Sequence, residues 1–498
     1  MLRLRSRSPV LLLAGVLAVA LTACAEAAQT GGAGAAGAAA ASDTTQAVDI
    51  TGTISLEPAS GPEGTQVRVT GQGLPASQEL ELHWSTASGR WLLEGKRNEE
   101  YHGREYTVGS TTLSTVTTDA DGGLETTFEV PSGYGFAHDV TLVDSSGVVK
   151  NKALFDVEPQ VTITPTEGPV GTPITIEVRG MGFQTLENAR TLIYDSSYVG
   201  FLSAVTTKGY AKAVIPAVGA PGPHKIRVLR GAYTFPYLNP QQSPRPDIPE
   251  FEETFTVTAG EAVSVPPIDE QNPKAVERTD DGTAGDGPVL TTDLSSGPVE
   301  TSVELIGQGF DPGASVDLVW YRVVGNRVSG QGWDEQSLPL TQTTVSGDGS
   351  FSAPVEVPHD VGGAHRIEAV VNGDAVSTTE FSITPAADPL TPESGPWGTE
   401  MKINLTGVGW TETANIYTVV YDNSYIGYSC GFNSQGDVEI TLPATGEPGW
   451  HYVDLYPAIY KGDETPGQQH FRIPQLTYAQ DHPGEDLPAF HFAFHLDG

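Results

Sequence analysis

One short phrase occurs four times in this chain of 498 residues. Its copies are SGPEGT at 60–65, EGPVGT at 167–172, SGPVET at 296–301 and SGPWGT at 394–399. Each copy precedes a stretch of alternating apolar and polar residues and then a Gly-x-Gly triplet. A repeat of about one hundred residues indicates that one domain has been copied along the chain. The alternation indicates that each copy is built from β-strands.

The copies are of two kinds. Tyr194 and Tyr421 are 227 positions apart, and so are His224 and His451. The second and fourth units therefore align without a gap over most of a domain. We interpret the chain as a duplicated two-domain block, A-B-A′-B′.

The first unit is longer than the third. Trp84 and Trp320 are 236 positions apart, whereas His138 and His365 are only 227 apart. The first unit thus carries nine extra residues, and we expect them to form a longer loop around residues 91–106.

Many short strands bounded by Gly, Pro, Asn and Asp predict an all-β array of four immunoglobulin-like β-sandwiches. The expected boundaries are 46–158 for domain A, 159–259 for B, 288–384 for A′ and 385–498 for B′, with a linker at 260–287. Only two cysteines are present, so we expect each domain to be held by its hydrophobic core and not by disulfides.

The N-terminus reads as a signal for secretion. A basic start and an apolar run within residues 1–23 end in Leu-Thr-Ala-Cys, which resembles a bacterial lipobox with Cys24 as the lipidated residue. The Ala- and Gly-rich segment 24–45 is expected to be a flexible tether. These features predict a lipoprotein anchored to the cell membrane through Cys24, on its extracellular face.

The net charge limits the partners. Asp and Glu number 62 against 26 Lys and Arg, which gives a formal charge of −36. So strong an acidic excess excludes nucleic acid as a partner.

The repeated phrase, with the strand and Gly-x-Gly that follow it, resembles the start of IPT/TIG-type immunoglobulin-like domains. That resemblance covers the opening third of each unit and implies an extracellular binding or adhesion module, not a chemistry. The third unit has Glu300 where the others have glycine, and we expect its turn to be built differently.

The B units share a further motif, Tyr-Asp-x-Ser-Tyr. Its candidate ligand-binding residues are Tyr194, Asp195 and Tyr198 in B, and Tyr421, Asp422 and Tyr425 in B′. Tyrosine rings and a carboxylate on a hairpin suit sugar recognition, but they suit cross-strand packing around a turn equally well.

We expect no enzyme, cofactor or metal. A histidine recurs at one place in every unit, which favours a structural role in satisfying backbone groups at a strand corner. Residues 427–431 match G-x-S-x-G but lack its strand-turn-helix context. The sequence therefore predicts a non-catalytic surface lipoprotein that binds an unidentified extracellular protein or polysaccharide. The alternatives are a carbohydrate-binding accessory protein that uses the tyrosine hairpins, and a purely structural spacer.

Overall fold

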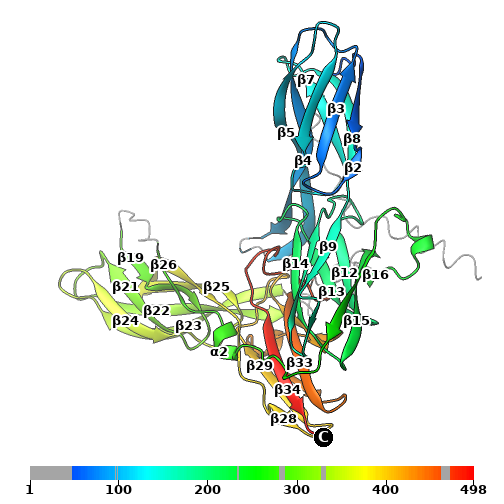
Figure 1. The fold of residues 1–498 in the computed structure, drawn as a ribbon. Helices are drawn as coiled ribbons and strands as arrows, with labels where there is room; N and C mark the ends of the chain where they lie inside the picture. Colours follow the sequence, from blue (N-terminus) through cyan, green and yellow to red (C-terminus); the bar gives the residue numbers. More distant parts are fainter. Residues whose placement is uncertain are drawn as a thin grey trace, which may run out of the picture.

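The computed structural model describes residues 47–95, 97, 99–232, 235–279, 287–326, 332–460 and 472–498. Within these ranges the chain forms eight β-sheets (Figure 1), and the helical elements are α2 (Ile268–Gln271) and two 3₁₀ turns, Pro240–Gln242 and Phe432–Ser434. The predicted all-β array of sandwiches is confirmed. The predicted signal peptide, the tether and Cys24 lie outside the described residues.

All four domains have one topology, in which a three-stranded sheet faces a larger sheet. In domain A the small sheet is β1 (Thr53–Glu57), β3 (Gln66–Gln72) and β6 (Leu124–Glu129), and the large sheet has the order β2 (Ser60–Gly61), β8 (Val149–Val157), β7 (Phe136–Val143), β4 (Glu79–Glu94), β5 (Glu100–Thr117). The strand β3 shows how the sequence produces two facing sheets. Its residues alternate between exposed and buried, and the buried Val67 and Val69 lie between the sheets.

The other domains repeat this order. In B the small sheet has the order β14 (Ala211–Pro216), β11 (Pro173–Arg179), β9 (Gln160–Thr164). The large sheet has the order β10 (Glu167–Gly168), β17 (Phe251–Val257), β15 (Gly222–Ala232), β12 (Ala189–Tyr194), β13 (Ser197–Ser203), with β16 (Phe235–Pro236) beside β15. In A′ the small sheet has the order β19 (Val289–Thr292), β21 (Ser302–Gln308), β24 (Phe351–Glu356). The large sheet has the order β18 (Val276–Glu277), β20 (Leu294–Gly297), β26 (Asp374–Ile383), β25 (Gly363–Val371), β22 (Ser315–Asn326), β23 (Gly332–Thr344). In B′ the small sheet has the order β27 (Ala386–Ala387), β29 (Glu400–Thr406), β32 (Val438–Pro443). The large sheet has the order β28 (Ser394–Gly395), β34 (Phe490–Leu496), β33 (Gly449–Ala458), β30 (Ile416–Tyr421), β31 (Ser424–Ser429).

The repeated phrase carries the chain from the small sheet to the large one. Its first two residues pair in parallel with the last strand of the same domain, as β2 does with β8. The threonine hydroxyl then donates to the proline carbonyl at 2.7 Å in all four copies. The glycine before the proline allows that threonine to pack closely, since a Cβ at Gly61 would lie 2.7 Å from Thr65 Oγ1.

The expectation of a different turn in A′ is wrong. Glu300 adopts φ +62°, in the left-handed region that Gly64, Gly171 and Gly398 occupy at +82° to +84°. Its N–H donates to Val357 at 2.9 Å, and the equivalent glycine N–H groups make the same bond at 2.8 to 2.9 Å. The turn is unchanged, and Glu300 holds a backbone conformation that disfavours a side chain.

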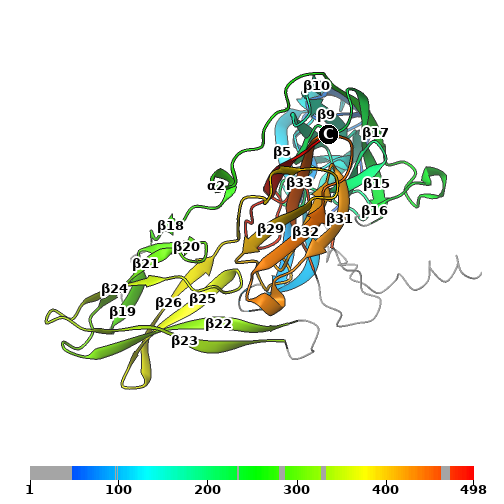
Figure 2. The same ribbon diagram turned by 90° about the horizontal axis from the view of Figure 1, so that it is seen from below.

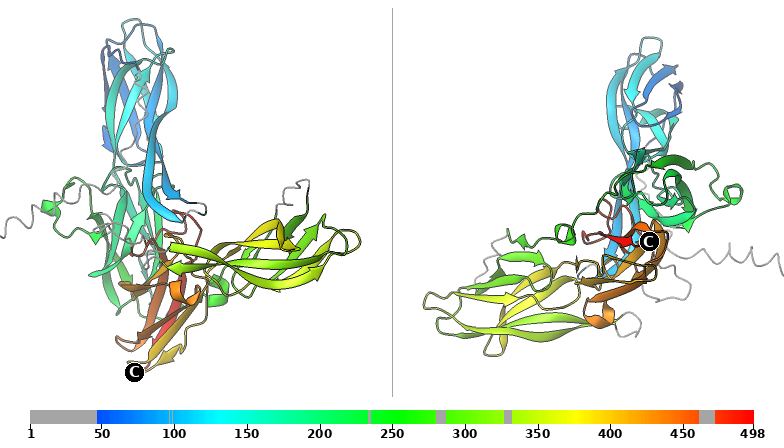
Figure 3. Two further views of the ribbon diagram at one scale, coloured as in Figure 1. Left: turned by 180° about the vertical axis from the view of Figure 1, so that it is seen from behind. Right: turned by 60° about the horizontal axis from the view of Figure 1, so that its bottom comes forward.

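The extra residues of domain A lengthen a hairpin and do not form the expected loop. The strands β4 and β5 pair continuously from Glu79 and Thr117 to Glu94 and Glu100, with two register shifts. Residues 91–94 and 100–106 are therefore strand, and the hairpin extends beyond its own sandwich (Figure 3).

The end of this hairpin reaches the three other domains. Arg104 Nη1 donates to the Asn188 carbonyl of B at 2.9 Å, Tyr101 N donates to Glu412 Oε2 of B′ at 2.7 Å, and Arg97 Nη2 pairs with Glu335 Oε1 of A′ at 2.7 Å. Domains A and B are stacked end to end, and A′ projects sideways from the B–B′ pair (Figures 1 and 2).

Domains B and B′ share a hydrophobic core. Val420, Tyr452, Tyr456 and Leu476 of B′ belong to the same buried cluster as the interior of B. The segment before β34 also pairs with the edge strand β13, because Phe201 exchanges backbone hydrogen bonds with Pro474 and Leu476 at 2.9 and 3.0 Å. This contact covers an edge that would otherwise expose unpaired backbone groups.

The segment predicted as the linker lies against B′ on its way to A′. The Gln271 side chain bonds both N–H and C=O of His491 in β34, at 2.7 and 2.9 Å. Asn272 does the same to Ala387 in β27, at 2.9 Å for both bonds. Two adjacent amides thus attach the segment to both sheets of B′.

We predict that Glu300→Gly stabilises domain A′. The change removes a left-handed side-chain cost of about 1–2 kcal/mol and adds a glycine entropy cost of about 0.5–1 kcal/mol. It also removes the solvent-exposed ion pair between Glu300 and His359 at 3.2 Å, which contributes little. The expected gain is about 0.5–1 kcal/mol, measured as slower hydrogen exchange in β21 and β24 by mass spectrometry.

Gly398→Glu is the matched control, because it introduces the same strain at the equivalent turn of B′. It should accelerate exchange in β29 and β32. Equal exchange in wild type and Glu300→Gly would show that the Glu300 backbone carries no strain.

Candidate functional site

The recurring histidine forms one arrangement in all four domains. Its ring stacks on an aromatic ring of the neighbouring large-sheet strand (β4, β12, β22 or β30). The pairs are Trp84–His138, Tyr194–His224, Trp320–His365 and Tyr421–His451, with centroids 4.4 to 5.7 Å apart. Its Nε2 lies 2.7 to 2.8 Å from the carbonyl oxygen four residues earlier in each case. The expected structural role of this histidine is confirmed.

The B domains differ from the A domains at the other ring nitrogen. In A and A′, Nδ1 bonds the carbonyl of Ser85 or Tyr321, and in A′ the Asp360 carboxylate lies farther off, at 3.5 Å from His365 Nδ1. In B and B′ it faces a carboxylate, with His224 at 2.8 Å from Asp195 and His451 at 2.5 Å from Asp422. The hydrogen bond that Asp422 accepts raises the pKa of His451, although burial opposes the shift.

The first tyrosine of each motif belongs to its own domain. Tyr194 is buried and its hydroxyl donates to the Val218 carbonyl at 2.8 Å. Tyr421 makes the equivalent bond to Thr445 at 2.7 Å. Both rings therefore pack under the histidine, and Asp195 and Asp422 orient that histidine from the hairpin.

The second tyrosine of each motif lies at the contact between B and B′. Tyr198 and Tyr425 meet edge to face, with ring centroids 6.5 Å apart. Tyr425 also donates to the Arg472 carbonyl, and burial raises the pKa of Tyr198 far above its usual range. Asp195 is exposed, whereas Tyr198, Tyr421, Asp422 and Tyr425 are half-buried. Ligand binding by the six residues stays a prediction, and the structure gives each of them an internal contact.

A buried carboxylate joins three domains, and the sequence motifs did not indicate it. Asp481 of B′ is fully buried and accepts hydrogen bonds from Val205 N, Thr206 N and Thr206 Oγ1 of B, each at 2.8 Å. The Trp91 indole of domain A donates to it at 3.2 Å. Asp481 follows no recognisable pattern in the sequence, so no local signal marks its role.

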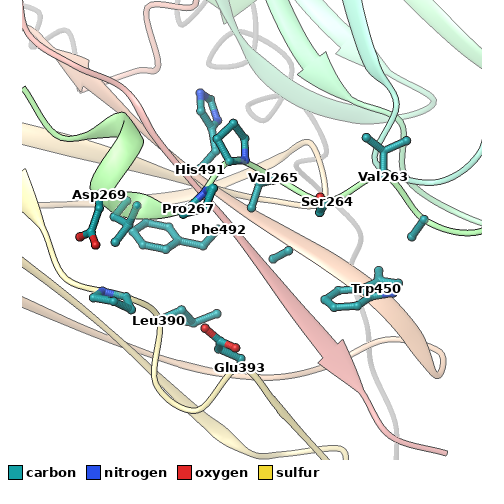
Figure 4. Close-up of a pocket in the computed structure, with 15 residues that line it drawn as sticks. Val263, Ser264, Val265, Pro267, Asp269, Leu390, Glu393, Trp450, His491 and Phe492 are labelled. Atoms are coloured by element: carbon teal, nitrogen blue, oxygen red, sulfur yellow. The ribbon is translucent and has the colours of Figure 1, made fainter.

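A groove lies where the segment 262–269 crosses domain B′ (Figure 4). Its volume is about 370 Å³, in the range of ligand sites. Val263, Val265 and Pro267 lie on one side and Leu390 and Glu393 on the other, while Trp450 stands at one end.

The polar groups of the groove are mainly acceptors. Asp269 and Glu393 line it, and among the residues with described positions the one cation bonded to either residue is Lys274, whose Nζ donates to the backbone carbonyl of Asp269 at 3.1 Å. His491 also lines it, and its Nδ1 is held at 2.7 Å by the buried Asp454. Burial opposes protonation of His491, but this hydrogen bond and the Asp454 charge raise its pKa overall.

Among the described residues, neither a metal-ligand cluster nor the strand-turn-helix context of a nucleophile elbow is present. No group of three or more His, Cys, Asp or Glu in the described ranges could hold a metal ion. Ser429 ends β31 and donates to the Tyr417 carbonyl at 3.3 Å, and only the 3₁₀ turn at 432–434 follows. No helix among these residues has the length and apolarity needed to cross a membrane.

No protein-family model matches the chain, and no curated protein matches it. Solved structures with local similarity include methylamine-reacted Salmonella alpha-2-macroglobulin (10% identity, 90% of this chain and 31% of that chain, TM-score 0.19). A second match is latent PorU from Porphyromonas gingivalis, with 14% identity over 67% of this chain and 34% of that chain, at a TM-score of 0.16. A third is the Yersinia pseudotuberculosis adhesin InvE, with 14% identity over 45% of this chain and 58% of that chain, at a TM-score of 0.16. The chain spans about a third of the alpha-2-macroglobulin and PorU chains, and TM-scores this low define no shared arrangement.

We predict that Asp481→Asn loosens the junction between domains. The amide offers one acceptor oxygen in place of two, so buried N–H groups lose partners at a cost of about 1–3 kcal/mol. Small-angle scattering should show a larger radius of gyration for the full-length chain in matched detergent-containing buffer.

Asp119→Asn serves as control, since Asp119 Oδ1 accepts two backbone bonds inside a turn of domain A. It should leave the scattering curve unchanged. If both variants scatter like wild type, Asp481 does not hold the domains together.

We predict that His451 titrates above its ordinary pKa of about 6.5, because Asp422 stabilises its charged form. A raised folded-state pKa adds stability below the unfolded-state value, and this stability is lost as pH rises through the folded-state pKa. A two-dimensional NMR titration of the imidazole signals measures the pKa directly.

Asp422→Asn should return the His451 pKa toward its ordinary value, whereas Asp195→Asn should leave the His451 curve in place. A His451 pKa that is the same in wild type and Asp422→Asn would contradict the assigned cause.

Proposed function

We propose that this chain is a non-catalytic, lipid-anchored surface protein that holds a binding surface on a rigid body of four sandwiches. The observation that carries the proposal is the junction at which the hairpin of domain A meets B, A′ and B′. Fixed relative positions of four domains favour the presentation of a defined surface over a flexible string of independent modules.

The expected position of the lipid anchor supports a protein that presents its binding surface away from the membrane. Residues 49 and 51 pair with Val149 and Lys150 at the start of β8, the end of domain A that is far from B. A tether over 24–45 spans about 25 Å as a random coil. Anchored at Cys24, the chain would direct A′ and B′ away from the membrane.

The spacer and carbohydrate alternatives are less well supported. A spacer needs length alone, whereas B and B′ pack side by side and shorten the molecule. Sugar binding by the tyrosine hairpins needs open rings, and the rings of Tyr198 and Tyr425 face each other.

The test has two parts and uses the full-length chain. We expect wild type in the membrane fraction of the producing cells, cleavable by protease added outside, and Cys24→Ala in the medium because it lacks the lipid. Purified chain in detergent, coupled to beads, should retain a macromolecule from intact cells or their shed surface material.

A Cys24→Ser variant, which is also non-lipidable, should behave as Cys24→Ala does. Retention of either variant in the membrane would remove the anchor. Beads that retain no macromolecule would remove the binding function and leave the spacer.

A further inference from the structure

The groove on B′ differs from the equivalent surface of the other domains. Trp450 occupies the position of Ala137, Pro223 and Ala364, directly before the recurring histidine. Its side chain is 44% exposed, although burying an indole would have been favourable. Domain B has Thr166 at the place of Glu393. The aromatic ring and this carboxylate are thus particular to the fourth domain.

The chemistry of the groove restricts its occupant. The walls are mostly Val, Pro, Leu, Ile and Phe, which fit aliphatic groups. No Lys, Arg, Asn or Gln lines it, so it offers few donors to the hydroxyls of a sugar, which both donate and accept. Lysine and arginine side chains only donate, and they match a groove whose free charged groups are carboxylates.

The carboxylates of the groove and the Trp450 ring both favour a cationic ligand. Asp269 and Glu393 are exposed, in a chain of formal charge −36. The nearby Lys274 ammonium donates to the backbone carbonyl of Asp269 at 3.1 Å and not to its carboxylate. Trp450 is exposed at the end of the groove, beside the His495 ring at a centroid distance of 5.1 Å, and an indole ring attracts a cation. Long-range attraction of the acidic chain would also speed the encounter with a basic partner.

We propose that this groove binds a polypeptide segment in which lysine or arginine residues flank apolar residues. The apolar side chains occupy the space between the segment 263–267 and Leu390. The cationic groups pair with Asp269 and Glu393, and one of them lies over Trp450. This proposal names the ligand class of the proposed binding function and rests on that function.

The probe is an array of synthetic octapeptides in which basic, acidic and apolar residues are varied, incubated with the full-length chain in detergent. We expect the bound peptides to combine basic with apolar residues and to lose binding when Lys is replaced by Glu. Their affinity, measured by fluorescence anisotropy, should fall as salt is raised from about 50 to about 500 mM.

Trp450→Ala and the double variant Asp269→Asn with Glu393→Gln should each weaken the best peptide by about tenfold, from the loss of cation–π and ion-pair contacts. Trp397→Ala is the matched control, because Trp397 is a more exposed tryptophan of the same domain that does not line the groove. Unchanged thermal unfolding of each variant shows that the fold is kept.

Four outcomes would overturn the proposal: bound peptides without a preference for Lys or Arg, equal loss in Trp397→Ala, a neutral oligosaccharide that displaces the peptides, or concentration-dependent dimers that Trp450→Ala abolishes. If beads retain a surface macromolecule from cells and the peptide array fails, the groove assignment is wrong and the binding function stands. If the beads retain nothing, the binding function fails as well.

Discussion

The burial of domain B against B′ is the contact on which the rest of the molecule depends. It places side chains of both domains in one core and brings the segment before β34 onto the open edge of β13. Once that pair is fixed, the hairpin of domain A can reach A′ and B′ at the same time, and A′ follows from its connection to B′. An apolar interface of this kind resembles a domain core more than a hinge between modules.

Buried carboxylates contribute to the junction alongside Arg97 and Arg104, in a chain with 62 acidic and 26 basic residues. Asp481, Glu412 and Asp360 are almost fully buried. Each accepts N–H groups from another element: Asp481 from Thr206, Glu412 from Tyr101, and Asp360 from Trp320 and Gln435. Backbone, indole and amide donors stabilise these charges by direct hydrogen bonds, so the acidic excess does not prevent close packing.

The sequence predicted what local geometry determines and missed what distant segments determine. The threonine–proline bond of the repeated phrase spans three residues, so the phrase predicted the turn in every domain. Glu300 was misjudged because the surrounding hydrogen bonds, and not the residue itself, impose its backbone angle. The residues around Trp91 were expected in a loop, since their partner strand and the domains they touch cannot be seen in the residues alone. The tyrosine motif was found as a repeat, but only the fold shows that Tyr198 faces Tyr425 and that the groove lies around Trp450.

The meeting of Tyr198 with Tyr425 has a consequence for how the molecule is organised. These are equivalent residues of duplicated domains, so the edge strands β13 and β31 meet at matching positions. The rest of the contact is not symmetric: Val420, Tyr452 and Tyr456 of B′ join the core of B, whereas their equivalents Ile193, Lys225 and Leu229 do not belong to the core of B′. The two halves are joined within one polypeptide. Covalent connection makes the local concentration of each half independent of the protein concentration. It has also allowed the halves to diverge, so that one hairpin lengthened on a single side and a tryptophan groove formed on the other.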